Sequence, residues 1–213
     1  ALRGAGIGAS DRVAVVLPNG PEMATAFVTV AQSATTAPLN PAYKEDEFAF
    51  YLEDLKARAI IVEAGYDGPA RAAAARFDMT VIELTATQPA GNFTLSTDVT
   101  GSAPDTLSTP DDVALILHTS GTTSRPKIVP LLQSNVAASA QNIAVSLALT
   151  PDDVCLNVMP LFHIHGLIAA ISGSLAAGGS ISCAPGFDAL KFYGWLQEVD
   201  PTWYTAVPTM HQA

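Results

Sequence analysis

The residues best suited to chemistry lie in one segment, His118–Lys127, which reads HTSGTTSRPK and follows the apolar run VALIL. Its small hydroxyl residues and single glycine leave backbone N–H groups and Oγ donors exposed, and a lysine ends it. Donors of this kind suit the oxygens of a phosphate group. From Phe77 onward the only basic residues are Arg125, Lys127 and Lys191, so the segment holds two of these three. We therefore predict an anion-binding loop here.

The segment is not a Walker A loop, because that motif has a second glycine directly before its lysine, and its lysine opens a helix. Here Pro126 precedes Lys127 and Ile128 follows it. The composition also fits a surface turn whose hydroxyl groups satisfy its own backbone. The residue types alone therefore leave a phosphate loop and a polar turn both open.

Other chemistries find less support in the sequence. His163, His165, Cys155 and Cys183 offer the atoms of a zinc site, but the familiar Cys-x2-Cys and His-x3-His spacings are missing. We expect no metal site and two buried, free thiols, as in a reducing compartment. No G-x-S-x-G elbow occurs, and no G-x-G-x-x-G loop follows a strand, so neither a serine hydrolase nor a dinucleotide site is predicted.

Composition and charge exclude several classes of protein. The 213 residues are 49% hydrophobic, which argues for a large folded core, and their net charge of −10 disfavours a nucleic-acid partner. The stretch Ile128–Phe187 has only Asp152 and Asp153 as ionised residues, yet prolines, glycines and histidines interrupt it too often for a membrane span. The first residues lack the features of a signal peptide, so we expect a cytoplasmic protein.

Short apolar runs alternate with amphipathic segments, which is typical of an α/β fold with layered, mostly parallel sheets and flanking helices. Phe48, Tyr51, Leu52 and Leu55, for example, recur at intervals of three and four residues and share one helix face. Residues 85–112, rich in Thr, Ser, Pro, Gly and Asp, break the alternation and are the expected crossover between subdomains. The expected strands cover residues 13–17, 59–62, 80–84, 113–117, 154–159, 180–183 and 203–207, and the expected helices residues 21–34, 46–57, 69–76, 134–149, 167–177 and 190–199.

Two strings, TSGTTSRPK and the later MPLFHIHGL, resemble signature segments of the adenylate-forming superfamily of acyl-CoA synthetases, luciferases and peptide-synthetase adenylation domains. DRVAVVLPNGPEMATAF, LNPAYKEDEFAFYLED and WYTAVPT resemble further segments of that superfamily in the expected order, so the resemblance covers essentially the whole chain. Ser124 and Ile128 stand where the superfamily usually has glycine. The serine variant, with FHIHGL and WYTAVPTMH, most resembles the oxalate–CoA ligase subgroup.

The resemblance implies a two-step reaction. A carboxylate attacks the α-phosphate of Mg-ATP to give an acyl adenylate and pyrophosphate, and the thiol of coenzyme A then displaces AMP. ATP, Mg²⁺ and coenzyme A are the expected cofactors, and a small carboxylate such as oxalate is the expected substrate. The alternatives are another acyl substrate, including a fatty acid, another thiol acceptor, or a non-catalytic nucleotide-binding module.

The resemblance also assigns residues. It implies that residues 1–213 are part of the large N-terminal domain, and that the C-terminal domain with the adenylation lysine is absent, so we assign no catalytic residue and expect this piece alone to be inactive. For His165, a cap on the following helix or a hydrogen bond to a carbonyl is the alternative role. The residues implied to hold the ATP phosphates are Thr119, Ser120, Gly121, Thr122, Thr123, Ser124, Arg125 and Lys127, and those implied to line the acyl pocket are His163, His165 and Gly166.

Overall fold

The computed structural model describes residues 1–119 and 126–213. The strands are β1 (Arg12–Val16), β2 (Thr35–Pro38), β3 (Ala59–Glu63), β4 (Thr80–Thr87), β5 (Asn92–Ser96), β6 (Val113–Thr119), β7 (Lys127–Leu132), β8 (Val154–Asn157), β9 (Ser180–Cys183) and β10 (Trp203–Thr205). The α-helices are α1 (Pro21–Ala31), α2 (Glu45–Leu55), α3 (Pro69–Ala75), α4 (Gln133–Ser146), α5 (Gly173–Ala177), α6 (Ala189–Val199) and α7 (Pro208–His211). A short 3₁₀ helix covers Arg3–Ala5, and a π-helix covers His165–Ser172 and leads directly into α5.

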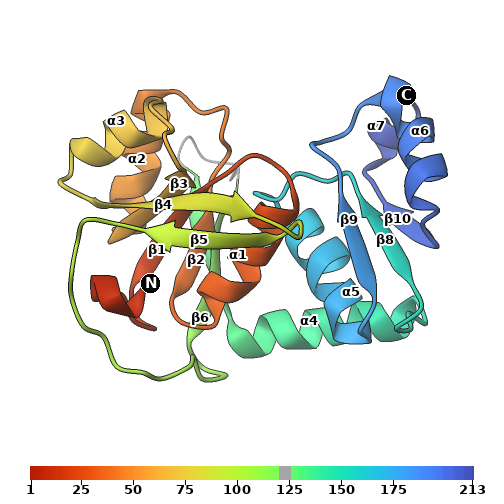
Figure 1. The fold of residues 1–213 in the computed structure, drawn as a ribbon. Helices are drawn as coiled ribbons and strands as arrows, with labels where there is room; N and C mark the ends of the chain where they lie inside the picture. Colours follow the sequence, from red (N-terminus) through yellow and green to blue (C-terminus); the bar gives the residue numbers. More distant parts are fainter. Residues whose placement is uncertain (120–125) are drawn as a thin grey trace.

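The strands form two sheets, which Figure 1 shows on either side of a layer of helices. The larger sheet has seven strands in the order β5-β4-β3-β1-β2-β6-β7, and the smaller has three in the order β10-β8-β9. All pairs are parallel except β4 with β5 and β6 with β7, which are antiparallel and lie at the two edges of the larger sheet. The predicted α/β class with layered, mostly parallel sheets is confirmed.

Three apolar clusters hold the layers together. Phe48 and Leu52 of α2 pack with α3 against one face of the larger sheet. Phe27 of α1 and Leu167 of the π-helix pack against its other face, and Ile181 of β9 joins the same cluster from the smaller sheet. The far face of the smaller sheet is covered by α6. The order is therefore helices, sheet, helices, sheet, helix, and the middle layer couples the two sheets.

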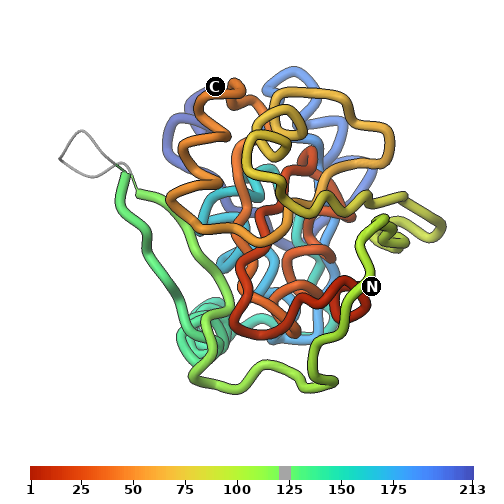
Figure 2. The backbone as a smooth tube through the Cα atoms, turned by 90° about the vertical axis from the view of Figure 1, so that its left-hand side faces the viewer, coloured from red at the N-terminus to blue at the C-terminus, as the bar shows by residue number. Residues whose placement is uncertain are grey.

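Residues 85–112, the expected crossover between subdomains, contain strand structure in their first part. Within this range, β4 continues to Thr87 and turns back as β5, so the expected break in the alternation of strands and helices begins later than residue 85. Successive side chains of a strand point to opposite faces of the sheet, so Phe93 and Leu95 of β5 pack against the core while Asn92, Thr94 and Ser96 stay exposed. Residues 97–112 contain no helix or strand, and Figure 2 shows this connection running along the outside of the molecule. A subdomain boundary in this region stays a prediction.

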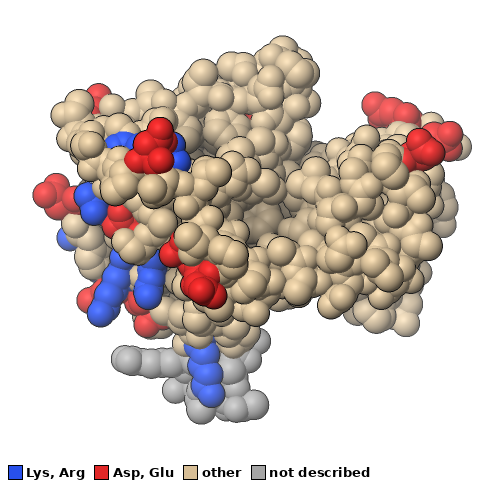
Figure 3. Space-filling model, turned by 90° about the horizontal axis from the view of Figure 1, so that it is seen from below, with Lys and Arg blue, Asp and Glu red and all other residues tan. Residues whose placement is uncertain are grey.

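The charged side chains are unevenly distributed. Figure 3 shows a face on which they gather over one side, while most of the remaining surface is uncharged. Arg58 pairs with Asp11 at 3.2 Å and Arg76 with Asp46 at 3.0 Å, so nearby carboxylates neutralise part of the positive charge of the protein. Among the described residues, no helix has both the length and the apolar character needed to cross a membrane.

Candidate functional site

The candidate site lies where the carboxyl ends of strands from both sheets meet. Open α/β sheets bind ligands at this edge, because the loops that leave parallel strands converge there. Asn19 follows β1, Thr119 ends β6, and Met159 and Ala184 follow β8 and β9. The side chain of Asn19 donates hydrogen bonds to the carbonyl oxygens of Met159 and Ala184. The carboxyl ends of the two sheets are therefore in contact here.

The hairpin of β6 and β7 carries the two described members of the predicted phosphate loop. Thr119 pairs with Lys127 at the end of the hairpin where the two strands are connected, so their side chains point to the same face, together with those of Leu117 and Val129. Both Thr119 and Lys127 are exposed. A hydroxyl and an ammonium group therefore stand side by side at the strand ends. The other predicted loop residues lie outside the described residues: Ser120, Gly121, Thr122, Thr123, Ser124 and Arg125.

The opposite face of the hairpin anchors it to α2. His118 and Ile128 pair across the hairpin, and Ile128, which replaces the usual glycine, packs against the α2 core cluster. Nε2 of His118 lies 3.1 Å from Oδ2 of Asp54, and its ring meets the ring of Tyr51 edge-on with centroids 4.7 Å apart. The His118 side chain is only 7% exposed. No role was predicted for His118, although it begins the predicted anion-binding segment near the carboxyl end of a buried strand.

A pocket of about 250 Å³ joins the hairpin to the loop that carries His163. The ring centroids of Phe162 and His163 are 4.7 Å apart. Desolvation by the surrounding protein lowers the pKa of His163, so its imidazole is neutral at pH 7 and can both donate and accept a hydrogen bond. The structure thus brings together His163 and Thr119, which the sequence placed in separate sites. The pocket is lined by Leu117, His118, Thr119, Val129, Leu131, Phe162, His163 and Ile164.

His165 opens the π-helix and is held by the smaller sheet. Its Nε2 lies 2.6 Å from Oγ1 of Thr205 at the end of β10. The partner of His165 among the described residues is thus a hydroxyl group, whereas a backbone carbonyl or a helix cap was the predicted alternative. The contact ties the first turn of the helix to β10.

Gly166 is buried at a close approach between two backbone segments. A Cβ atom on it would lie 2.6 Å from the carbonyl oxygen of Pro160 and 3.2 Å from Cδ2 of Leu161. Real Cβ atoms essentially never approach a backbone oxygen so closely. The glycine therefore lets the helix pass directly behind the loop that carries His163.

Replacing Gly166 with alanine is expected to destabilise the protein by about 1–3 kcal/mol, because the added methyl group overpacks a backbone contact that cannot give way. The urea midpoint of the intact protein measures the effect. Gly194→Ala is the matched control, since nothing lies within 4 Å of its added Cβ and alanine favours a helix by about 1 kcal/mol. Equal midpoints for Gly166→Ala and the wild type would contradict the packing argument.

Stability is expected to fall as the pH drops below about 6.5. Burial lowers the pKa values of His118 and His163 below their ordinary value of 6.5, so protonation favours the unfolded chain. The stabilisation is complete above pH 6.5, the ordinary pKa that applies to the unfolded chain, and is lost progressively as the pH falls from there through the lowered pKa values of the folded protein. Urea midpoints at pH 7.5 and 5.5 test this, and His118→Gln is expected to weaken the pH dependence. A urea midpoint that rises on acidification would contradict the predicted loss of stability at low pH.

The two cysteines and the acidic residues offer no further chemistry. Cys155 and Cys183 are free, and burial raises the pKa of each thiol to about 12, so neither is a thiolate at neutral pH. Within residues 1–119 and 126–213, no three His, Cys, Asp or Glu side chains gather as a metal site would require.

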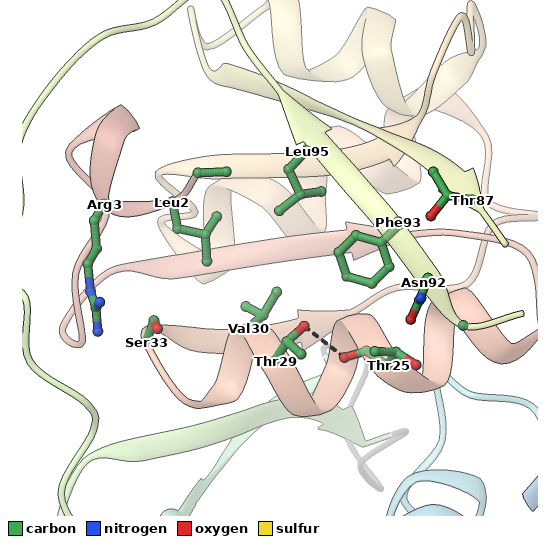
Figure 4. Close-up of a pocket in the computed structure, with 12 residues that line it drawn as sticks. Leu2, Arg3, Thr25, Thr29, Val30, Ser33, Thr87, Asn92, Phe93 and Leu95 are labelled. Carbon is green, nitrogen blue, oxygen red and sulfur yellow. Dashed lines mark hydrogen bonds between the residues drawn. The ribbon is translucent and has the colours of Figure 1, made fainter. Parts of the chain in front are cut away.

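A larger cavity lies away from the predicted site residues. It measures about 480 Å³ and lies between α1 and β5, with side chains such as Thr25, Thr29 and Phe93 along its walls (Figure 4). Of the described residues that line it, Arg3 is the one charged side chain, and Arg3 donates hydrogen bonds to Asp105 and to the carbonyl oxygen of Thr106. The candidate site is therefore the smaller pocket at the carboxyl edge.

The fold and the site define a layered α/β protein in which the hydroxyl group of Thr119 and the ammonium group of Lys127 lie at the sheet edge where the parallel strands end. The model of the family described as AMP-binding enzyme matches residues 1–213, and the chain belongs to this family. The resemblance to adenylate-forming proteins that the two signature segments indicated is thereby confirmed.

Named relatives and solved structures agree with this assignment. The chain is 42% identical to an oxalate–CoA ligase from Arabidopsis thaliana, covering 98% of this chain and 42% of that protein. It is 37% identical to an oxalate–CoA ligase from Saccharomyces cerevisiae, covering 94% and 42%. The crystal structure of ATP-bound MatB from Rhodopseudomonas palustris matches with a TM-score of 0.79 and 27% identity, covering 99% and 42%. The chain thus spans about two fifths of the length of these relatives.

Proposed function

We propose that this chain is part of the N-terminal domain of an AMP-forming acid–thiol ligase. The intact protein joins a carboxylate to ATP, releases pyrophosphate, and passes the acyl group from AMP to the thiol of coenzyme A. The observation that carries the proposal is that Thr119, which pairs with Lys127 across the hairpin, lines the same pocket as His163. This arrangement offers donors for phosphate on one side and a polar group for a carboxylate on the other.

The phosphate side of the site is assigned to the hairpin. Thr119 and Lys127, with residues 120–125 between them, hold the β- and γ-phosphates of ATP, and Mg²⁺ accompanies the nucleotide. Hydrogen bonds to charged oxygens are about twice as strong as neutral ones, so a lysine beside hydroxyl donors is well suited to this task. Electrostatic stabilisation of this kind counts most as charge develops on the leaving pyrophosphate.

The carboxylate side is assigned to the loop and helix that follow β8. His163 contacts the substrate carboxylate from the pocket wall, and His165 and Gly166, at the start of the π-helix, are assigned to the same carboxylate side. The bond of His165 to Thr205 leaves one ring nitrogen for this purpose. Gly166 contributes by allowing the close backbone approach.

Oxalate is the substrate that we propose. Two relatives at 42% and 37% identity are named oxalate–CoA ligases, and the pocket of about 250 Å³ lies below the size of about 300–1,000 Å³ that is usual for drug-sized ligands. A small dianion suits such a space better than the long apolar chain of a fatty acid, which is the main alternative within the family.

A panel of carboxylates tests the proposal. The intact gene product is mixed with ATP, Mg²⁺, coenzyme A and either oxalate, malonate, succinate or a fatty acid, and pyrophosphate release is recorded. We expect the highest kcat/KM with oxalate. A preference for the fatty acid would refute the substrate, and the absence of carboxylate-dependent pyrophosphate release would refute the reaction.

We also propose that the 213-residue piece alone is inactive, because the adenylation lysine that the resemblance implies lies outside it. Acyl-AMP formed by this piece would contradict that, and calorimetry with ATP separates a purely nucleotide-binding module from a piece that binds nothing. A cytoplasmic location is part of the same proposal, since the described cysteines are free, as in a reducing compartment.

A further inference from the structure

One asparagine outside the predicted site joins the two sheets at the candidate pocket. Asn19 lies in the turn between β1 and α1, and its side chain is half-buried. Its Nδ2 donates to the carbonyl oxygens of Met159 and Ala184, each at 3.1 Å, and its Oδ1 accepts from the backbone N–H of Leu161 at 2.7 Å. The amide thus uses both of its donor hydrogens and its acceptor oxygen in contacts with the smaller sheet.

These contacts end on the loop that leads to His163. Met159 and Leu161 lie four and two residues before His163, and the N–H of His163 donates to the carbonyl oxygen of Pro160 at 3.3 Å. The buried side chain of Asn157 bonds both the N–H and the carbonyl oxygen of Met159 at 3.2 and 3.1 Å. Two asparagines therefore hold the loop by hydrogen bonds, and of these two Asn19 is the one that follows a strand of the larger sheet.

Asn19 is anchored to the interior of the larger sheet through β1, the strand that precedes it. β1 lies in the interior of that sheet and pairs with β2 and β3, and Val13 and Val15 are fully buried in it. The hairpin that carries Thr119 and Lys127 belongs to the same sheet. Asn19 is thus the polar link between the sheet that bears the phosphate donors and the loop that bears His163.

We propose that Asn19 is a positioning residue, which sets the place of His163 relative to Thr119 and Lys127 by holding the backbone at Met159 and Leu161. The expected effect of Asn19 on catalysis rests on the proposed function, whereas its hydrogen bonds to the loop at Met159 and Leu161 do not. Displacement of a substrate-contacting group by about 1 Å lowers the rate by about 10²-fold. A purely structural residue would instead reduce the amount of folded enzyme and leave the KM of both substrates unchanged.

Asn19→Ala and Asn19→Asp in the intact protein test the inference. The aspartate keeps the shape of the side chain but places an oxygen where Nδ2 faces two carbonyl oxygens, so both variants lose those bonds. We expect kcat/KM for the carboxylate to fall by about 10²-fold, while the KM for ATP stays within about twofold of the wild type. Asn135→Ala, which removes one bond from the N–H of Leu132 at the start of α4, is the control and is expected to leave both constants unchanged.

Hydrogen exchange supplies a readout that does not depend on activity. The N–H of Leu161 loses its acceptor in Asn19→Ala, so a peptide covering residues 159–164 is expected to exchange faster than in the wild type, whereas peptides from α3 are unchanged. An unaltered exchange rate of the 159–164 peptide would refute the claim that Asn19 holds this loop in place. Faster exchange with an unaltered kcat/KM would overturn the positioning role, and a wild type without carboxylate-dependent activity would count against the proposed function alone.

Discussion

Lys127→Ala in the intact protein is expected to slow ATP–pyrophosphate exchange by about 10²–10³-fold, the usual loss when one preorganised donor to a developing charge is removed. Lys127 begins β7 and pairs with Thr119, which lines the pocket, and no other lysine or arginine of the described residues belongs to this hairpin. Its ammonium group is therefore the charge that the described structure offers to the phosphates. Lys127→Arg keeps the charge and is expected to retain more of the activity than the alanine variant.

Lys191→Ala is the matched control for this experiment. Lys191 is also exposed, but it lies on α6 and its Nζ is 3.8 Å from Oδ2 of Asp188. A general loss of positive charge from an acidic protein would affect both variants alike, whereas loss of a phosphate contact affects only Lys127. An exchange rate of Lys127→Ala equal to that of the wild type would remove this residue from the site.

His163→Ala is expected to lower kcat/KM for the carboxylate by about 10–100-fold, because a hydrogen bond to a charged group contributes about 1.5–3 kcal/mol. The KM for ATP is expected to change by less than about twofold, since His163 lies on the loop side of the pocket and not on the hairpin. Steady-state kinetics with each substrate varied in turn measures both quantities.

His211→Ala serves as the control, because His211 is exposed and contacts Tyr204 rather than the pocket that holds His163. His163→Gln separates the hydrogen bond from the volume of the ring, since its amide can still donate. Equal losses of ATP and carboxylate binding in His163→Ala would indicate a distorted site rather than a lost contact, and would contradict the assignment to the carboxylate.

The elements with strong apolar patterns were predictable and one central strand was not. The predicted strand 59–62 and helix 46–57 match β3 and α2 closely, because both bury large side chains at the period of their structure. β2, of sequence TTAP, has no large apolar residue although it lies between β1 and β6. It is buried through small residues, and Oγ1 of Thr35 donates to the carbonyl oxygen of Val113 at 2.8 Å. Hydropathy gives no signal for such a strand.

β7 was also missed, and its sequence explains why. Pro130 within KIVPLL argues against a strand in the interior of a sheet, because proline lacks the N–H that a second neighbour would need. The strand is at the edge, where this loss is tolerated. The predicted helix over 167–177 begins two residues earlier, as a π-helix at His165, because hydrophobic spacing does not distinguish a π-helix from an α-helix.

The candidate site was predictable where its residues stand in the signature segments. Thr119, Lys127 and His163 could be named from the sequence, but their meeting around one pocket depends on the packing of two sheets. The contacts of Asn19 with Leu161 and of His118 with Asp54 join residues far apart in the chain. Such long-range polar contacts leave no periodic pattern in a single sequence, so only the structure supplies them.

The transfer of oxygen from the substrate to AMP tests the central claim most directly. Attack of the carboxylate on the α-phosphate leaves one carboxylate oxygen between carbon and phosphorus, and the thiol then breaks the bond to carbon. The intact protein is incubated with ¹⁸O-labelled oxalate, ATP, Mg²⁺ and coenzyme A, and the nucleotide product is analysed by mass spectrometry. We predict AMP that carries one ¹⁸O atom for each thioester formed. Unlabelled AMP alongside the thioester, or ADP with labelled inorganic phosphate, would contradict the account.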